Sequence, residues 1–128
     1  MYTSDSPFVQ GSIWWQLQGD LEDDWVAIEQ LYQLPRSHGL DHQDAVRLAL
    51  GTSIWLTTFE GVRVGRFEDG GPLFVPVGPS GPELTQWLIE YWRDYPEDGG
   101  DLLWDYCLEH PSIREHEGVI RTRPWAPR

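Results

Sequence analysis

Apolar side chains recur between residues 82 and 95 with the spacing of one face of an α-helix. The stripe consists of Leu84, Trp87, Leu88, Tyr91, Trp92 and Tyr95. Pro82 suits the first helical position, because its fixed φ matches a helix and its missing N–H would be unpaired there anyway. A helix with so many aromatic rings on one face needs a second layer of structure to cover them. The segment therefore predicts a helix over residues 82–95 that packs on a sheet.

Three short segments before this helix have the pattern of antiparallel strands. They are Ile54–Phe59, Val62–Phe67 and Leu73–Val77, and glycine-containing turns separate them. Their spacing predicts a three-stranded meander over residues 52–77. Pro76 places the last strand at an edge of the sheet, because proline has no N–H to donate to a neighbouring strand.

The rest of the chain adds one strand and three helices to this prediction. We expect a strand over Phe8–Leu17, a helix that Asp20 caps and that ends at Pro35, a helix over His42–Leu50 between the cap Asp41 and the terminal glycine Gly51, and a helix from the cap Asp101 to His110. The sequence thus predicts a single acidic α+β domain over residues 1–128. About four helices pack on one face of a small antiparallel sheet, which consists of the meander and the N-terminal strand.

Charge is the second constraint on this chain. It has no lysine, nine arginines and 21 carboxylates, so that its formal net charge is −12. Such a surface repels nucleic acid and anionic membranes, and it attracts basic proteins. The acids are unevenly distributed, since residues 1–35 contain six acids and no base, and residues 67–109 contain ten acids and one arginine. The fold could therefore gather them into a patch.

The predicted helix over residues 101–110 carries its acids in one row. Asp101, Asp105 and Glu109 follow each other at four-residue steps, which places like charges side by side. Further acids lie on the preceding helix and loop. Together these side chains form the predicted partner-binding surface: Glu90, Asp94, Glu97, Asp98, Asp101, Asp105 and Glu109.

The alternative is that an arginine from the C-terminal part of the chain neutralises this row. The candidates are Arg114, Arg121 and Arg123. The two possibilities predict opposite effects of replacing Asp105 and Glu109 by glutamine. An unpaired row predicts unchanged or higher stability, because repulsion is relieved. A paired row predicts a loss of stability.

His38 and His42, with Asp41 and Asp44 nearby, are the one combination with a metal-ligand spacing. Such a pair suits zinc only if both histidines lie on the same face of a helix. Gly39 and the predicted cap at Asp41 place them on different sides of a helix start. We therefore expect neither a metal ion nor a cofactor.

Two other features concern single side chains. Cys107 is the sole cysteine, which excludes an internal disulfide, and its apolar neighbours predict a buried thiol.

Trp14 and Trp15 are adjacent in the expected N-terminal strand, so they point to opposite faces. One of the two is therefore either covered by a helix or exposed, and an exposed tryptophan could anchor a partner.

These features favour a small non-catalytic interaction protein. Its acidic face would dock on a basic surface of a partner protein and block it, as immunity proteins, antitoxins and phage-type inhibitors of nucleic-acid enzymes do. One alternative is a small acidic enzyme or metal-binding protein that uses clustered carboxylates or His38 and His42. Another is a module that binds a small molecule between tryptophans. The N-terminus lacks basic residues and a long apolar run, and no segment has the length of a membrane span, which predicts a cytoplasmic protein.

Overall fold

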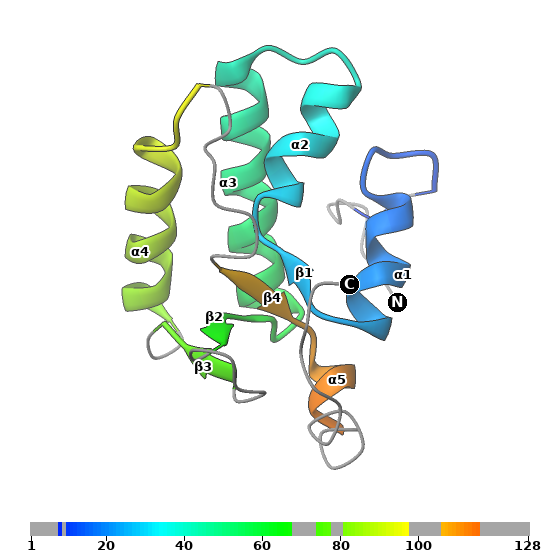
Figure 1. The fold of residues 1–128 in the computed structure, drawn as a ribbon, viewed down its shortest axis with the longest axis vertical. Helices are drawn as coiled ribbons and strands as arrows, with labels where there is room; N and C mark the ends of the chain where they lie inside the picture. The colour runs from blue at the N-terminus through cyan, green and yellow to red at the C-terminus, as the bar shows by residue number, and fades with distance from the viewer. Residues whose placement is uncertain (1–7, 9, 68–73, 78–80, 98–105, 116–128) are drawn as a thin grey trace.

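The computed structural model describes residues 8, 10–67, 74–77, 81–97 and 106–115. In chain order its elements are α1 (Trp15–Asp23), β1 (Val26–Ala27), α2 (Gln30–Ser37), α3 (His42–Phe59), β2 (Arg63–Phe67), β3 (Phe74–Pro76), α4 (Pro82–Arg93), β4 (Cys107–Glu109) and α5 (Pro111–Glu115). Helices α2, α3 and α4 lie side by side, and α1 lies beyond β1 at one edge of the sheet (Figure 1). A small antiparallel sheet with helices confirms the predicted α+β class.

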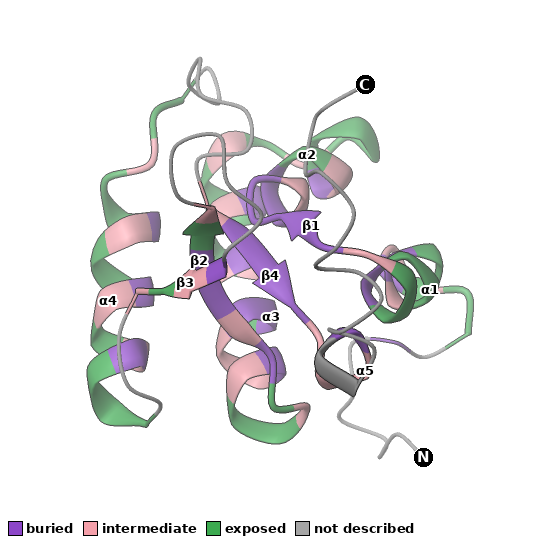
Figure 2. Cartoon of the chain, turned by 60° about the horizontal axis from the view of Figure 1, so that its bottom comes forward, coloured by how far each residue is buried: buried purple, intermediate pink, exposed green. Residues whose placement is uncertain are grey.

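The sheet separates two apolar clusters. Its four strands are antiparallel and follow the order β1-β4-β2-β3. Val26, Val64 and Leu108 face the larger cluster, where they meet Leu56 of α3 and Leu88 of α4. The opposite face of the sheet belongs to a smaller cluster with Trp25, Phe74, Cys107 and Ile113. Figure 2 shows that β4 and the facing sides of α3 and α4 are buried.

The centre of the sheet corrects the helix predicted over residues 101–110. Cys107–Glu109 form β4, which pairs with both β1 and β2, and residues 101–105 lie outside the described residues. A short apolar run fits a buried strand as well as a helix, and periodicity does not separate the two. In the structure Leu108 enters the larger cluster and Cys107 enters the smaller one, which is the alternation of a strand. The prediction of a buried thiol is confirmed.

The predicted meander is wrong in its first strand. The helix expected over His42–Leu50 continues through Ile54–Phe59 as α3. β-branched residues favoured a strand there, but the buried stripe of the helix continues without a break through Ala45, Ala49, Ser53 and Leu56. Gly51 lies inside the helix. The glycine that follows its end is Gly61, whose φ of 69° is in the left-handed region that favours glycine.

The N-terminal region also differs from the prediction. The segment expected as the strand Phe8–Leu17 contains turns and the start of α1, so that Asp20 lies inside a helix rather than capping one. The helix expected to end at Pro35 is divided by β1, and its second part, α2, continues past this proline. The division occurs at Asp24, where the backbone becomes extended. The apolar residues of the expected helix are buried all the same: Leu21, Trp25, Ile28 and Tyr32.

Two predictions around α4 are confirmed. Pro82 begins α4, and the buried side of this helix consists of Leu84, Leu88 and Trp92. The second and third predicted strands exist as the β2–β3 pair, and β3 lies at an edge of the sheet. The N–H of Val77 donates to the carbonyl oxygen of Val64 at 2.9 Å, so the alternation of an antiparallel pair turns the nitrogen of Pro76 away from β2. The β3 edge therefore has no donor at this position.

Gly65 allows an aromatic ring to lie directly over β2. A Cβ atom at this position would overlap the carbonyl oxygen of Val75 and would lie 2.8 Å from the ring of Phe74. The same ring contacts Phe67, with 5.5 Å between the ring centroids, and the guanidinium of Arg63 lies 5.4 Å from its centre. The absence of a side chain at Gly65 thus brings Phe74 close to the charged group of Arg63.

Candidate interaction surface

Glu109 is buried in the sheet, and three donors from other described residues point to its carboxylate. Its Oε1 accepts from Nε of Arg63 at 2.8 Å and from the Nη2 of the same guanidinium, and its Oε2 accepts from Nε1 of Trp25 at 3.1 Å. Arg63 and Glu109 face each other across β2 and β4, so the sheet register itself brings the two charges together. The side chain of Glu109 is only 2% exposed. This carboxylate is a structural group inside the protein.

The burial of Glu109 corrects its place in the predicted partner-binding surface. It does not project from a helix in a row with Asp101 and Asp105, and both of these lie outside the described residues. The predicted alternative named Arg114, Arg121 or Arg123, whose side chains lie outside the described part of the structure, and it stays a prediction. The arginine that pairs with Glu109 is Arg63 of β2. Sequence reasoning missed this pair because Arg63 and Glu109 are 46 residues apart.

Three of the predicted docking residues lie together near the end of α4. Glu90 and Asp94 are one helical turn apart, Glu97 follows the helix, and all three are exposed. We call these three residues the α4 acidic surface. Arg93 lies 3.4 Å from Asp94, but both side chains are more than half exposed, so the pair contributes little to stability. The remaining predicted residue, Asp98, lies outside the described residues.

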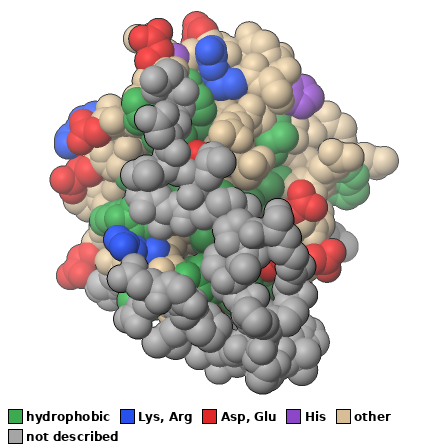
Figure 3. All heavy atoms as spheres, in the orientation of Figure 1, with side chains coloured by type: hydrophobic (Ala, Val, Ile, Leu, Met, Phe, Trp, Pro, Cys, Tyr) green, Lys and Arg blue, Asp and Glu red, His purple; other side chains and the backbone are tan. Residues whose placement is uncertain are grey.

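A second acidic region was not predicted as a site. A groove of about 400 Å³ lies between α1 and the segment that leads from β1 into α2, and we call it the α1 groove. Leu17, Val26 and Leu34 supply apolar lining, and the carboxylate-bearing residues that line it are Asp20, Asp23 and Asp24. None of the described residues that line this groove is basic. Figure 3 shows carboxylates both over α4 at the left and over α1 at the right.

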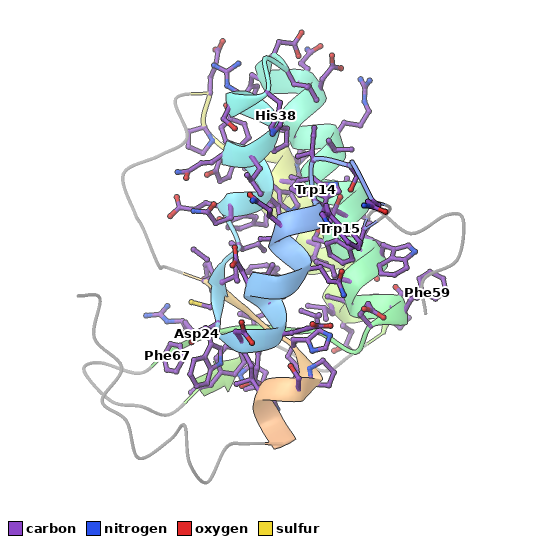
Figure 4. All side chains as sticks on the ribbon, turned by 90° about the vertical axis from the view of Figure 1, so that its right-hand side faces the viewer. Trp14, Trp15, Asp24, His38, Phe59 and Phe67 are labelled. Atoms are coloured by element: carbon purple, nitrogen blue, oxygen red, sulfur yellow. The ribbon has the colours of Figure 1, made fainter. Side chains whose placement is uncertain are left out.

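The end of α1 is electrostatically unfavourable as it stands. Asp20 and Asp23 are exposed in the last turn of this helix, and that turn has no basic residue. The C-terminal end of a helix carries partial negative charge, so carboxylates there repel it. Figure 4 faces α1, with Trp14 and Trp15 at its beginning and Asp24 after its end. The run of acids at residues 20–24 was visible in the sequence, but the helix predicted there started after Asp20 instead of ending at Asp23.

The two tryptophans at the start of α1 differ in exposure. Trp14 is 3% exposed and packs in the larger cluster, whereas Trp15 is 45% exposed. The two side chains thus point to different environments, as expected, but they do so at the start of a helix and not in a strand. Phe59, the last residue of α3, is also exposed (Figure 4).

Of the three histidines in the described part of the chain, His42 and His110 make local hydrogen bonds. The hydroxyl of Tyr32 donates to the carbonyl oxygen of Glu97 at 2.9 Å, so its contact of 3.0 Å with Nδ1 of His42 is a bond that the histidine donates. His38 is exposed at the end of α2. Within the described ranges, no group of three or more His, Cys, Asp or Glu side chains is placed to hold a metal ion.

Ser112 and His110 are close enough to suggest a catalytic nucleophile and its base. Their hydrogen bonds instead indicate a structural role. The backbone N–H of Ser112 donates to Nδ1 of His110 at 3.1 Å, which caps the start of α5. The Ser112 hydroxyl donates to the carbonyl oxygen of Glu22 at 2.8 Å, and it lies 2.9 Å from the same Nδ1. The pair ties α5 to the end of α1.

Comparison of the chain with protein-family models, with curated proteins and with solved structures finds no match. Among the helices that the structure describes, none is long and apolar enough to cross a bilayer. Interpretation of function therefore depends on the chemistry of the surface.

Proposed function

We propose that this protein is a non-catalytic interaction protein that docks on a basic surface of a partner protein and blocks it. The docking residues are the α4 acidic surface, Glu90, Asp94 and Glu97. The proposed class of partner is a nucleic-acid enzyme, on whose basic surface these carboxylates take the place of phosphates, as immunity proteins, antitoxins and phage-type inhibitors do.

The observation that carries the proposal is the excess of exposed carboxylates over arginines among the described residues. The net charge is −12, and Arg63 is used inside the protein by Glu109. Of the other arginines whose side chains are described, Arg47 and Arg93 each approach a neighbouring carboxylate, at 3.6 and 3.4 Å, with both partners exposed. Such pairs neutralise little of the surface potential that a basic partner would meet.

The two alternatives receive less support from the described residues. His42, His110 and Ser112 take part in caps and local hydrogen bonds, which favours a non-catalytic role for these three residues. The aromatic rings of α4 cover one another: Trp87 and Tyr91 are stacked at 5.1 Å, and both contact Tyr106. Packing thus accounts for these rings without a bound small molecule.

Capture of partners on the immobilised full chain tests the proposal. An extract from the native host is applied at low salt and eluted with a salt gradient. We expect basic proteins to be retained and to elute as salt rises, because screening weakens contacts between exposed charges. A partner identified in this way is then assayed for inhibition of its activity by the pure protein.

Two variants with the same change of charge make this test specific. The first is Glu90→Gln/Asp94→Asn/Glu97→Gln on the α4 acidic surface, and the second is the control Glu22→Gln/Asp44→Asn/Glu83→Gln. We expect the first to lose most of the binding and the control to keep most of it. Equal losses, or partners that remain bound at high salt, would contradict docking through the α4 acidic surface.

A further inference from the structure

The outer edge of β1 has a backbone position with no hydrogen-bond partner among the residues that the structure describes. Val26 is opposite Leu108 and Ala27 is opposite Cys107 in the pairing with β4, and the N–H of Ile28 donates to the carbonyl oxygen of Tyr106 at 3.0 Å. Hydrogen-bonding direction alternates along an antiparallel strand, so Val26 and Ile28 bond to β4 and Ala27 faces away from it. Because β1 is the first strand of the sheet, the N–H and C=O of Ala27 point away from β4, to the side on which the described residues place no further strand.

Ala27 is also buried. The residue is 3% exposed, and its backbone N–H and C=O have no hydrogen-bond partner among the described residues. Buried backbone groups are almost always paired in native proteins, since an unpaired one loses its bond to water without replacement. An unpaired N–H and C=O of one residue at a sheet edge are the groups that an added strand would use.

The open edge lies along the α1 groove. Ala27 and its neighbour Val26 line this groove on one side, and Asp20 and Asp23 of α1 line it as well. The groove thus combines a backbone position that can bond to an extended chain with carboxylates that can bond to its side chains. Its volume of about 400 Å³ suits a short peptide segment rather than a folded surface.

We propose that the α1 groove binds an extended, arginine-bearing segment of a partner protein by strand addition to β1. The segment pairs with the N–H and C=O of Ala27, and its guanidinium groups pair with Asp20 and Asp23. This site is separate from the α4 acidic surface and does not depend on it.

The chemistry of the groove favours arginine over other side chains. None of the described lining residues is basic, and cations would relieve the repulsion between Asp20, Asp23 and the C-terminal end of α1. A guanidinium is planar, more weakly hydrated than an ammonium, and able to hold a carboxylate with two hydrogen bonds. It therefore suits a groove whose lining also contains apolar side chains such as Leu17 and Leu34.

The test uses the full chain labelled with nitrogen-15 and a hexa-arginine peptide as the probe. We expect the Ala27 amide signal to shift on addition of the peptide, and its hydrogen exchange to slow. A hexa-arginine peptide with methylated backbone nitrogens has the same charge but cannot donate backbone hydrogen bonds. We expect it to bind more weakly and to leave the exchange of Ala27 unchanged, because strand addition needs these bonds.

A charge-matched pair of variants tests the carboxylates. Asp20→Asn/Asp23→Asn changes the groove, and Glu22→Gln/Glu83→Gln makes the same change of charge at residues that do not line it. We expect the groove variant to bind hexa-arginine about fivefold more weakly, a loss in the range that two exposed ion pairs provide. The control should change the affinity less than twofold.

Each contrary result overturns strand addition and has its own meaning. Equal weakening by both variants, or equal binding of the methylated peptide, shows that the affinity for the peptide depends on the net charge of the protein alone. An Ala27 amide that is already protected in the free protein shows that another part of this chain covers the edge. Failure of hexa-arginine to bind at low salt removes the groove as a site, and binding of a basic partner to the α4 acidic surface remains a separate measurement.

Discussion

Carboxylates occupy two contrasting regions of this molecule. In the sheet, Glu109 is enclosed by the guanidinium of Arg63 and the indole of Trp25, and its position follows from the register of β2 and β4. On α1, Asp20 and Asp23 are exposed at the end of a helix that disfavours them. The first carboxylate contributes to the fold through its partners. The other two are exposed at a helix end that disfavours them, and they are the carboxylates that we propose to bind a partner.

The comparison teaches that the role of an acidic residue depends on the element that carries it. A strand in the middle of a sheet places a carboxylate opposite a defined neighbour, whereas the last turn of a surface helix places it in solvent. Glycines divide in the same way, since Gly65 of β2 is in close contact with β3 and Gly51 of α3 faces open space. Four variants test this contrast.

The largest effect is expected from Glu109→Ala. It leaves Arg63 and the indole N–H of Trp25 without their acceptor in a largely buried place, so we expect a loss of about 3 kcal/mol in the free energy of unfolding. Urea denaturation measures it. Asp94→Ala, which breaks an exposed pair with Arg93, should cost less than about 0.5 kcal/mol. Similar losses for both variants would show that Glu109 is no more structural than a surface acid.

Gly65→Ala should have the next largest effect. Its methyl group would overlap the carbonyl oxygen of Val75 and press on the ring of Phe74, so β3 must move. We expect a loss of about 1–3 kcal/mol, the usual range for overpacking. Thermal unfolding followed by circular dichroism gives the result. An unchanged melting temperature would mean that β3 does not lie against Gly65.

Gly51→Ala should change stability in the opposite direction. Nothing lies within 4 Å of a Cβ atom at this position, and the residue is in the interior of α3. Alanine is favoured over glycine inside a helix by about 0.5–1 kcal/mol. Denaturant unfolding of this variant beside Gly65→Ala should give opposite signs, and a destabilised Gly51→Ala would contradict a continuous α3.

The smallest effect is expected from Asp20→Asn/Asp23→Asn. Removal of two negative charges from the C-terminal end of α1 should raise the free energy of unfolding by a few tenths of a kcal/mol at low salt. Added salt should reduce the difference. Glu83→Gln is the control of opposite sign, because Glu83 lies in the first turn of α4, where a carboxylate is favourable. A loss of stability in the double variant would show that these aspartates have partners within the chain.

In this chain, long apolar patterns that fit a single type of secondary structure predicted the fold correctly, and short or ambiguous ones did not. The stripe of α4 extends over several turns and fits a helix alone, so its position and buried side were predictable. Ile54–Phe59 is short and rich in β-branched residues, and whether it forms a strand or a helix is decided by the continuation of α3 from Ala45 and Ala49. Local propensity could not foresee this, because the deciding contacts come from the neighbouring helices.

The candidate sites were predictable only in part. The excess of charge and the acids near the end of α4 could be read directly. The role of Glu109 could not, since its partners are 46 and 84 residues away in the chain. The expectation that neutralising it relieves repulsion is reversed once Arg63 stands opposite. The α1 groove was missed because the break at Asp24 and the pairing of β1 depend on β4, near the other end of the chain.

The nitrogen of Pro76, turned away from β2, has a consequence for the stoichiometry of any assembly built on this sheet. Polymerisation through strand pairing needs two competent edges, so that each subunit can bind one neighbour and offer a place to the next. At the β3 edge, proline removes the donor that a neighbour would need. Growth that begins at β1 meets, on the far side of the described sheet, a position that cannot donate a hydrogen bond. A neighbour that pairs along β3 therefore leaves one of its own acceptors without a donor opposite Pro76.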